Sequence, residues 1–301
     1  MKILITGGTH GMGKGVAKVL AGIDQQAHEI IILCRSKNLG EEIIKEFEQT
    51  TCNKQVSIIL CDLSKLSEVK HAIQEIQIKH EFLDGIFINA GLGYARERVE
   101  TEDGMDSHFQ VNYLSHFMLV LNLLSLLEKS AHGGRVIFNT SKGGEIFWDD
   151  MQMKDKWAYE AGIHQAMLAK RMFLIKLHTI YRARKGSNLS FIGFQIHKIV
   201  WSNQLKIIPT FMRMMATVMK FLGAFISIEK CGEVMAPLFT ENEEKSLEKS
   251  GKLITWKKNE FIRMEDSHDA LNSELQDRLW RVSLELCADE KTRQIAARLY
   301  H

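Results

Sequence analysis

The chain has very little proline and no long apolar run. Two prolines occur in 301 residues, and no segment rich in glycine, serine or proline separates one part of the chain from another. No stretch reaches the roughly 20 apolar residues that a membrane-spanning helix needs. We therefore expect a single domain over residues 1–301 and no transmembrane segment.

Paired cysteines and an excess of charge are also missing. The five cysteines form no Cys-x-x-Cys pair and show no metal-ligand spacing, which argues against a disulfide framework and gives no metal site. An odd number of thiols fits a reducing compartment, and a first strand that is predicted from residue 2 leaves no room for a signal peptide. We therefore expect a cytoplasmic protein. The formal net charge of +2 gives no basis for nucleic-acid binding.

Short apolar segments alternate with longer amphipathic ones along the first two thirds of the chain. Strands are predicted at residues 3–5, 29–34, 56–61, 85–89, 135–139 and 190–196, and helices near residues 12–22, 39–49, 66–80, 104–129 and 158–184. Strands that alternate with helices form parallel sheets with both faces covered. The pattern predicts an α/β fold of the Rossmann type, a doubly wound parallel sheet in one domain.

A glycine-rich turn joins the first predicted strand to the first predicted helix. Gly7, Gly11 and Gly13 stand where side chains would keep a pyrophosphate away from the backbone. The helix that begins near Met12 offers unpaired N–H groups to that anion. Because the motif follows a strand and opens a helix, it predicts dinucleotide binding.

The ends of the next two strands concern the adenosine half of the dinucleotide. Arg35 follows the second strand, where an acidic residue would accept a hydrogen bond from the 2′-hydroxyl of NAD(H). An arginine there pairs instead with a 2′-phosphate, which favours NADP(H) over NAD(H). Asp62 follows the third strand and would either bind the adenine amino group or cap the next helix.

Several short motifs follow one another in a fixed order. They are Thr-Gly-Gly-Thr-His-Gly-Met-Gly at 6–13, Asp-Leu at 62–63, Asn-Ala-Gly at 89–91, Thr-Glu-Asp-Gly at 101–104, Val-Asn at 111–112, Phe-Trp-Asp-Asp-Met-Gln at 147–152, Ser-Gly-Lys at 250–252 and Leu-Gln-Asp-Arg-Leu-Trp at 275–280. In this order they resemble the short-chain dehydrogenase/reductase family, and most of all its retinol-dehydrogenase-like branch. The resemblance implies that the cofactor is held by Gly7, Thr9, His10, Gly11, Met12, Gly13, Arg35, Asp62, Leu63, Asn89, Ala90 and Gly91.

The resemblance also implies where the catalytic residues should lie. The family uses a Ser, a Tyr and a Lys four residues after the Tyr, with a supporting helix Asn; Ser141 and Asn112 match the Ser and the Asn. The motifs on either side put Ile163 at the Tyr position and Met167 at the Lys position. Ile163 cannot exchange a proton and Met167 carries no charge, so the usual catalytic pair is missing.

Two residues are candidates for a replacement acid. Tyr159 lies one helical turn before Ile163, and His164 directly follows it; their alternative roles are packing at the entrance and a partly buried helix position. Lys170, farther along this helix, is expected to be a solvated or capping lysine. Residues 197–205 depart from the family's His-Pro-Gly turn and the Thr after it, so the nicotinamide half of the site is less well kept than the adenosine half.

Residues 201–227 are rich in methionine and phenylalanine, and by resemblance this segment forms an apolar cap over the substrate. The alternatives are a helix packed on the core or on a second subunit, or attachment to a membrane surface. We expect an NADP(H)-binding protein that acts on an apolar small molecule by non-standard catalysis, either redox or a non-redox isomerisation or cyclisation. The rival hypothesis is a catalytically silent nucleotide-binding scaffold or partner subunit. The resemblance implies homodimers or tetramers through the helices near 104–129 and 158–184.

Overall fold

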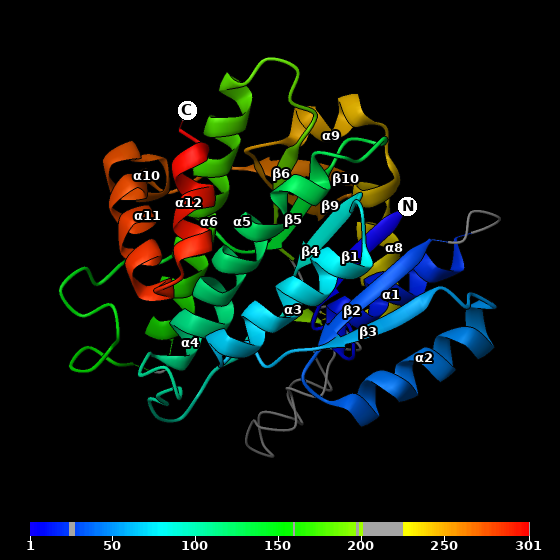
Figure 1. Cartoon of the computed structure of the whole chain (residues 1–301), viewed down its shortest axis with the longest axis horizontal. Helices are drawn as coiled ribbons and strands as arrows, with labels where there is room; N and C mark the ends of the chain where they lie inside the picture. The colour runs from blue at the N-terminus through cyan, green and yellow to red at the C-terminus, as the bar shows by residue number, and fades with distance from the viewer. Residues whose placement is uncertain (24–27, 159, 197–198, 201–224, 301) are drawn as a thin grey trace.

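The computed structural model describes residues 1–23, 28–158, 160–196, 199–200 and 225–300. Its centre is an eight-stranded sheet in the order β10-β9-β6-β5-β4-β1-β2-β3 (Figure 1). All neighbouring strands in this sheet are parallel except β9 and β10. The expected doubly wound α/β fold is therefore confirmed.

The strands and helices have the following bounds. The large sheet contains β1 (Lys2–Thr6), β2 (Glu29–Cys34), β3 (Val56–Leu60), β4 (Gly85–Ile88), β5 (Arg135–Asn139), β6 (Ser190–Phe194), β9 (Leu253–Lys257) and β10 (Glu260–Met264), and a small parallel sheet contains β7 (Ile199–Val200) and β8 (Phe225–Ile226). The helices are α1 (Gly11–Gly22), α2 (Lys37–Thr51), α3 (Leu66–Lys79), α4 (Ser107–Phe109), the π-helix η1 (Gln110–Leu114), α5 (Ser115–Leu127), α6 (Ala161–Ala183), α8 (Ile228–Thr240), α9 (Glu243–Lys249), α10 (His268–Leu271), α11 (Ser273–Cys287) and α12 (Glu290–Arg298).

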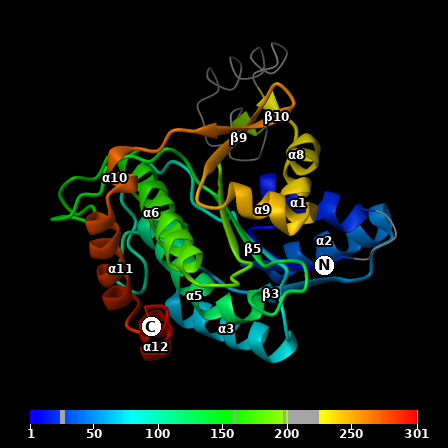
Figure 2. The same ribbon diagram turned by 90° about the horizontal axis from the view of Figure 1, so that it is seen from above.

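Helices cover both faces of the large sheet, and each face has its own apolar core. Helices α3, α5 and α6 pack on one face, and α1, α2 and α8 pack on the other (Figure 2). Residues 30–33 of β2 are buried on both sides, which explains their unbroken apolar character. The strand order reverses between β1 and β4, and ligands of such sheets bind at that point, beyond the carboxyl ends of the strands.

Helices α11 and α12 pack on the outside of α5 and α6 (Figure 2). The Trp280 ring of α11 lies 5.3 Å from the ring of Phe117 and 5.9 Å from that of Phe173, centroid to centroid. The Tyr113 hydroxyl lies 2.7 Å from Ser283 Oγ. The helices that the resemblance places in an oligomer interface are thus covered by the C-terminal helices of the same chain.

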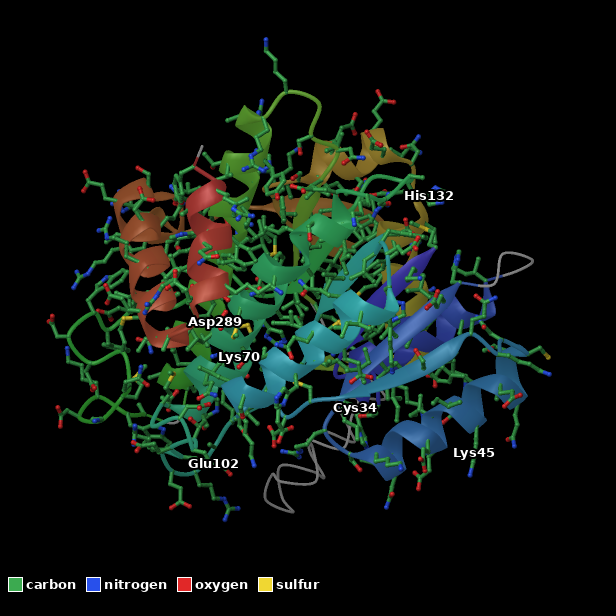
Figure 3. All side chains as sticks on the ribbon, viewed as in Figure 1. Cys34, Lys45, Lys70, Glu102, His132 and Asp289 are labelled. Carbon is green, nitrogen blue, oxygen red and sulfur yellow. The ribbon has the colours of Figure 1, made fainter. Side chains whose placement is uncertain are left out.

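An ion pair and an amide also hold α12 in this position. Lys70 Nζ of α3 lies 3.3 Å from Asp289 Oδ1, just before α12 (Figure 3). Asn122 of α5 donates to Thr292 Oγ1 of α12 at 2.8 Å. The segment Ser107–Leu127 is long and apolar enough to cross a membrane by composition, but 94% of its 18-residue window is buried in the molecule, so α5 is a core helix. No other helix of this kind occurs among the described residues.

Helices α1 and α8 approach each other through glycine. A Cβ on Gly15 would clash with Ile228 O, and a Cβ on Gly232 would clash with Gly15 O. Ile228 is the first residue of α8, so this contact lies directly after the predicted cap, residues 201–227. Residues 201–224 of that cap lie outside the described residues.

Candidate functional site

The turn after β1 has the backbone shape that only glycine adopts without strain. Gly7 has a φ of +69° and Gly11 a φ of +55°, both in the left-handed region. A Cβ on Gly13 would clash with Gly7 O and would lie 2.6 Å from Asn89 Nδ2. The turn is therefore packed against its own backbone, and its outer side is left for a ligand.

Helix α1 begins directly after this turn. His10 is its N-cap residue but makes no side-chain capping hydrogen bond, so its ring does not block the first N–H groups of the helix. The His10 ring is exposed and its Nδ1 lies 3.1 Å from Thr9 Oγ1, whereas the Met12 side chain is buried in the core beneath. Thr9 and His10 are thus at the rim of the cradle and Met12 supports it.

Asn89 fastens the end of β4 to the glycine turn. Its Nδ2 donates to Thr6 O at 3.1 Å and to Gly7 O at 3.4 Å. Thr6 Oγ1 in turn accepts from the backbone N–H groups of Asn89 and Ala90, at 2.9 and 3.0 Å. The Asn-Ala-Gly motif therefore shapes the cradle, and the Asn89 side chain binds the protein's own backbone.

The adenosine end of the predicted site is open at Arg35 and partly occupied at Asp62. Arg35 is exposed after β2 and has no hydrogen-bond partner among the described residues. Asp62 Oδ1 accepts from Ser64 N and Ser64 Oγ, at 2.9 and 2.7 Å. Asp62 does not cap α3, because the Leu66 amide donates instead to Asp103 Oδ2 at 2.8 Å. The capping alternative for Asp62 is therefore wrong, since α3 starts four residues later.

Leu63 and Gly91, two further residues of the predicted cofactor site, make contacts inside the protein. The Leu63 side chain is buried in the core, and its carbonyl accepts from Ser115 Oγ at 2.6 Å. A Cβ on Gly91 would lie 3.0 Å from Asn112 Oδ1. Gly91 therefore allows Asn112 to approach the backbone of the loop that follows β4.

Ser141 lies two residues after β5, at the same edge of the sheet. Its side chain is partly buried and has no hydrogen-bond partner among the described residues. The loop that contains Ser141 packs against α6: a Cβ on Gly143 would lie 2.8 Å from Leu168 Cδ1, and one on Gly144 would lie 2.5 Å from His164 Cβ. This loop is thus held beside the first turns of α6.

The same part of α6 is also tied to the end of β5. Thr140 Oγ1 donates to the carbonyl of Met167 at 2.9 Å, which ties the end of β5 to the fourth residue after Ile163. Ile163 and Met167 are partly buried, as is His164, whose ring has no hydrogen-bond partner among the described residues. Tyr159 lies outside the described residues.

Asn112 is held in a tight contact with the backbone of the loop after β4. Its Oδ1 accepts from Leu92 N at 2.6 Å and its Nδ2 donates to Leu92 O at 3.1 Å, so a substrate would compete with these bonds. Asn112 lies in the π-helix η1, and single π-helical turns are frequent at functional sites.

His116 is a residue of this site that the sequence did not reveal. It lies one turn after Asn112 and is fully buried, with Nδ1 3.2 Å from Asn112 O and Nε2 3.2 Å from Thr6 Oγ1. Burial, and to a lesser extent the charge of Lys170, lower the pKa of His116 to about 3, so the imidazole is neutral near pH 7. The four-residue spacing from Asn112 was the available signal.

Tyr94 is a second residue that the sequence analysis missed. It lies on the loop after β4, and its side chain is about half exposed. Tyr113 and Tyr181, by contrast, are buried on the α5–α6 side, where their hydroxyls contact Ser283 and Glu128. Tyr94 could have been noticed in the sequence because it lies five residues after Asn89, at the carboxyl end of a central strand.

Lys170 is neither solvated nor a cap, which corrects the expectation from the sequence. Its side chain is 1% exposed, and its Nζ donates to Asn139 O at 3.1 Å. The reason is that the carboxyl end of β5 lies against this face of α6, as the Thr140–Met167 hydrogen bond also shows.

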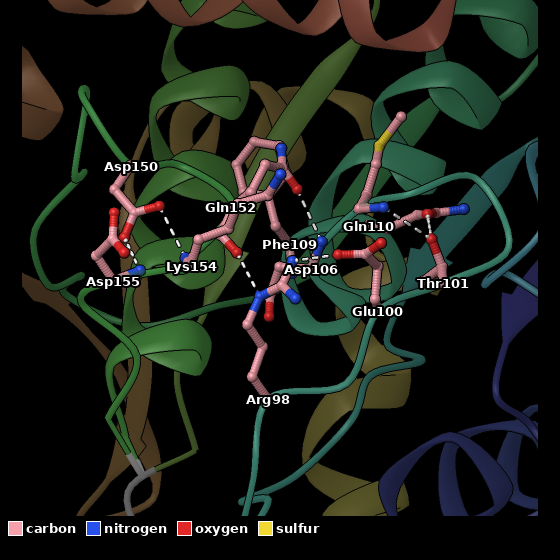
Figure 4. Close-up of polar contacts among 11 residues, drawn as sticks. Arg98, Glu100, Thr101, Asp106, Phe109, Gln110, Asp150, Gln152, Lys154 and Asp155 are labelled. Atoms are coloured by element: carbon pink, nitrogen blue, oxygen red, sulfur yellow. Dashed lines mark hydrogen bonds and ion pairs between the residues drawn. The ribbon is translucent and has the colours of Figure 1, made fainter.

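A polar cluster holds two loops together near the start of α6 (Figure 4). Arg98 Nε donates to Gln152 O at 2.8 Å, and Gln152 Oε1 accepts from the backbone N–H of Asp106 at 2.7 Å. Gln165 of α6 accepts from Phe147 N at 2.9 Å and donates to Met151 O at 2.8 Å. The motif at 147–152 is therefore anchored to α6 at Gln165, two residues after Ile163.

Comparisons with known proteins agree with this geometry. Residues 1–153 match the family model of the short chain dehydrogenases. Human polyprenol dehydrogenase is 30% identical over 193 residues, 62% of this chain and 57% of that protein, so this match spans little more than half of the relative. Mouse retinol dehydrogenase 12 is 27% identical over 294 residues, 94% of this chain and 85% of that protein.

The fold has many solved counterparts. One of them is L-sorbose reductase from Gluconobacter frateurii, solved with NADPH and L-sorbose, which has a TM-score of 0.66 and 15% sequence identity and covers 85% of this chain and 94% of that one. With the family model matching half of the chain and the glycine turn, the Asn-Ala-Gly clamp and the sheet order in place, the chain belongs to the short-chain dehydrogenase family.

Proposed function

We propose that this chain binds NADP(H) at the carboxyl edge of β1, β2 and β4. The supporting observation is the cradle: left-handed Gly7 and Gly11, the clamp by Asn89, and an α1 N-terminus without a side-chain cap. Arg35 stands exposed after β2, where a 2′-phosphate would find a guanidinium. The structurally similar L-sorbose reductase was solved with NADPH.

The proposed substrate is an apolar alcohol or carbonyl compound. Two kinds of support exist for this choice. Curated relatives are named polyprenol dehydrogenase and retinol dehydrogenase, after long hydrocarbon alcohols. Residues 201–227 of this chain supply phenylalanine and methionine, which suit an irregular apolar ligand.

The proposed catalysis uses no Tyr–Lys couple. A nicotinamide held at this site would supply hydride transfer, and in an ordinary member of the family a phenol and an ammonium exchange the proton on the substrate oxygen. Here Ile163 and Met167 stand at those register positions, beside the loop of Ser141. The proton must therefore come from water or from another side chain, while the Ser141 hydroxyl is available to hydrogen-bond the substrate oxygen. Acid–base help is worth about 10²- to 10⁴-fold, so turnover should be slow.

The second candidate function is a catalytically silent, nucleotide-binding scaffold or partner subunit. It is favoured by the same two hydrocarbon positions, together with the engagement of the Asn112 side chain by Leu92. Both functions predict cofactor binding, and they differ in whether any substrate is consumed.

A titration followed by an activity screen separates these functions. NADPH fluorescence is measured as protein is added, and the complex is then offered a panel of long-chain and polyprenyl aldehydes while NADPH consumption is followed. We expect binding and slow consumption with at least one apolar aldehyde. Tight binding without consumption of any compound would favour the silent scaffold, and no binding would overturn the cofactor proposal.

Restoring the missing couple tests the register. We expect the double variant Ile163→Tyr/Met167→Lys to raise kcat/KM for an apolar aldehyde by about 10²- to 10⁴-fold, because a phenol with a lowered pKa then exchanges the proton. The control Ile163→Phe/Met167→Leu changes shape without adding either group. Unchanged turnover in the restored variant, with NADPH binding intact, would contradict the assignment of these two positions.

A further inference from the structure

Lys170 is a buried amine that has no counter-ion among the described residues. Its pKa is lowered to about 7, and burial is the cause of this shift. No carboxylate of the described residues contributes to it. Among the residues outside the described ranges the sequence contains one acidic side chain, Asp24. An ammonium buried without a partner is unfavourable, so the amine loses its proton readily, and an anionic ligand nearby would favour the ammonium form.

Hydrogen bonds connect Lys170 to the glycine turn through two asparagines. Lys170 Nζ donates to Asn139 O at 3.1 Å, and Asn139 Nδ2 lies 3.5 Å from Asn89 Oδ1. Asn89 Nδ2 then donates to Thr6 O and Gly7 O. The orientation of the Asn89 amide is set by its two carbonyl acceptors, which leaves its oxygen facing Asn139.

The other groups that face Lys170 do not supply the missing charge. His116 approaches from the side of η1 and α5 and is neutral near pH 7. The side chains at the ends of β1, β4 and β5 are neutral; they are Thr6, Asn89 and Asn139. On α6 itself, the neighbouring Arg171 is paired with Asp266. The ionisation of Lys170 therefore responds to whatever anion occupies the cradle.

We propose that Lys170 is a positioning residue for the dinucleotide: it takes up a proton when the anionic cofactor binds and, through Asn139 and Asn89, holds the glycine turn in its binding shape. This inference rests on the proposed binding of NADP(H). The phosphates favour the ammonium form, and the ammonium holds Asn139 O more strongly than a neutral amine does. At an effective dielectric constant of about 20, a charge on the far side of this short chain of residues raises the amine's pKa by about one unit or more.

Calorimetry counts the protons that accompany binding. NADPH is titrated into the wild-type protein at pH 8 in two buffers of different ionisation enthalpy, where a phosphate monoester with a pKa of about 6 is already fully ionised. We expect an uptake of about half a proton or more per NADPH, and an affinity that falls about fivefold or more between pH 7 and pH 9.

Two variants assign this uptake to Lys170. Lys170→Gln keeps a donor for Asn139 O but cannot ionise, and Lys170→Met removes the donor as well. We expect both to lose the proton uptake and the pH dependence of affinity. Lys176→Met is the matched control, because Lys176 lies on the same helix and pairs with Asp277 of α11; it should retain both.

The outcomes distinguish this inference from the proposed function. If wild-type protein does not bind NADPH, both fail. If it binds NADPH without proton uptake, or if Lys170→Gln shows the wild-type uptake, the role of Lys170 is overturned while cofactor binding stands. Should Lys170→Met fail to fold, Lys170→Gln still decides the question, because it preserves the hydrogen bond to Asn139.

Discussion

At the scale of single residues, the glycine turn after β1 is shaped by the absence of side chains at its glycines. Gly13 faces two groups at once, the carbonyl of Gly7 and the side-chain amide of Asn89. The Asn89 amide makes the hydrogen bonds that join β4 to the turn. A side chain at residue 13 would therefore disturb both the turn and the clamp.

We expect Gly13→Ala to lower the free energy of unfolding by about 1–3 kcal/mol through overpacking and to weaken NADPH binding. Urea denaturation and NADPH fluorescence measure the two effects. Gly22→Ala is the control on the same helix, because its Cβ would meet only Thr51 Cγ2 at an ordinary 3.4 Å. If the two variants behaved alike, the packing around Gly13 would not be the cause.

The sequence was informative about residues whose role is local. Gly7 and Gly11 could be predicted because a tight turn between strand and helix demands left-handed backbone angles, and Gly13 because the start of the helix lies close to that turn. Lys170 could not, since its burial depends on β5, a distant segment of the chain. The alternative of a capping role for Asp62 was wrong for the same reason, because Asp103 reaches α3 from another loop.

At the scale of elements, α3 receives its N-terminal cap from that loop. Asp103 Oδ2 accepts from the Leu66 amide at 2.8 Å and from Gln110 Nε2 at 2.6 Å. The carboxylate therefore joins the start of α3 to the π-helix that contains Asn112. Removing it leaves the N–H at the helix start unpaired and removes the bond made by Gln110 Nε2, so that Gln110 keeps only its bond from Thr101 Oγ1 among the described residues.

We expect Asp103→Ala to cost about 1 kcal/mol of unfolding free energy, the usual loss for a helix cap. Glu102→Ala is the adjacent control: Glu102 is 73% exposed and pairs with Lys65 on the surface, so its loss should change stability by less than about 0.5 kcal/mol. Chemical denaturation of both variants checks this, and equal losses would argue against the capping role.

The six strands predicted from apolar runs lie where expected, while β9 and β10 were not predicted from the sequence. These two strands form an edge hairpin whose two-residue turn, Lys258 and Asn259, has positive φ at both positions. The turn lacks glycine, so its sequence gives a weak signal. β9 also pairs with β6, a long-range contact that no local pattern reveals.

At the scale of the whole molecule, α11 and α12 cover the α5–α6 face. Trp280 is 5% exposed and contacts Phe117 and Phe173 across this junction. Assembly through α5 and α6 would require these helices to leave. The resemblance to relatives could not show this, because the covering contacts join segments more than a hundred residues apart.

We expect Trp280→Ala to lower the free energy of unfolding by about 3–5 kcal/mol and to cause concentration-dependent association as the apolar face opens. Thermal denaturation and light scattering measure these changes. Arg281→Ala, an exposed neighbour on α11, should leave both near the wild-type values. A wild-type dimer whose cross-links map to α5 and α6 would contradict the covering role of α11.

The glycine contact between α1 and α8 has a consequence for how these helices are spaced. The backbones of Gly15 and Ile228 are in direct contact, so no side chain lies between α1 and the first residue of α8 at this point. Ile228, the first residue after the predicted cap, is therefore held at a fixed position along α1. The separation of the glycine turn from Ile228 is therefore set by two backbones in contact, and no change of side-chain rotamer can alter it.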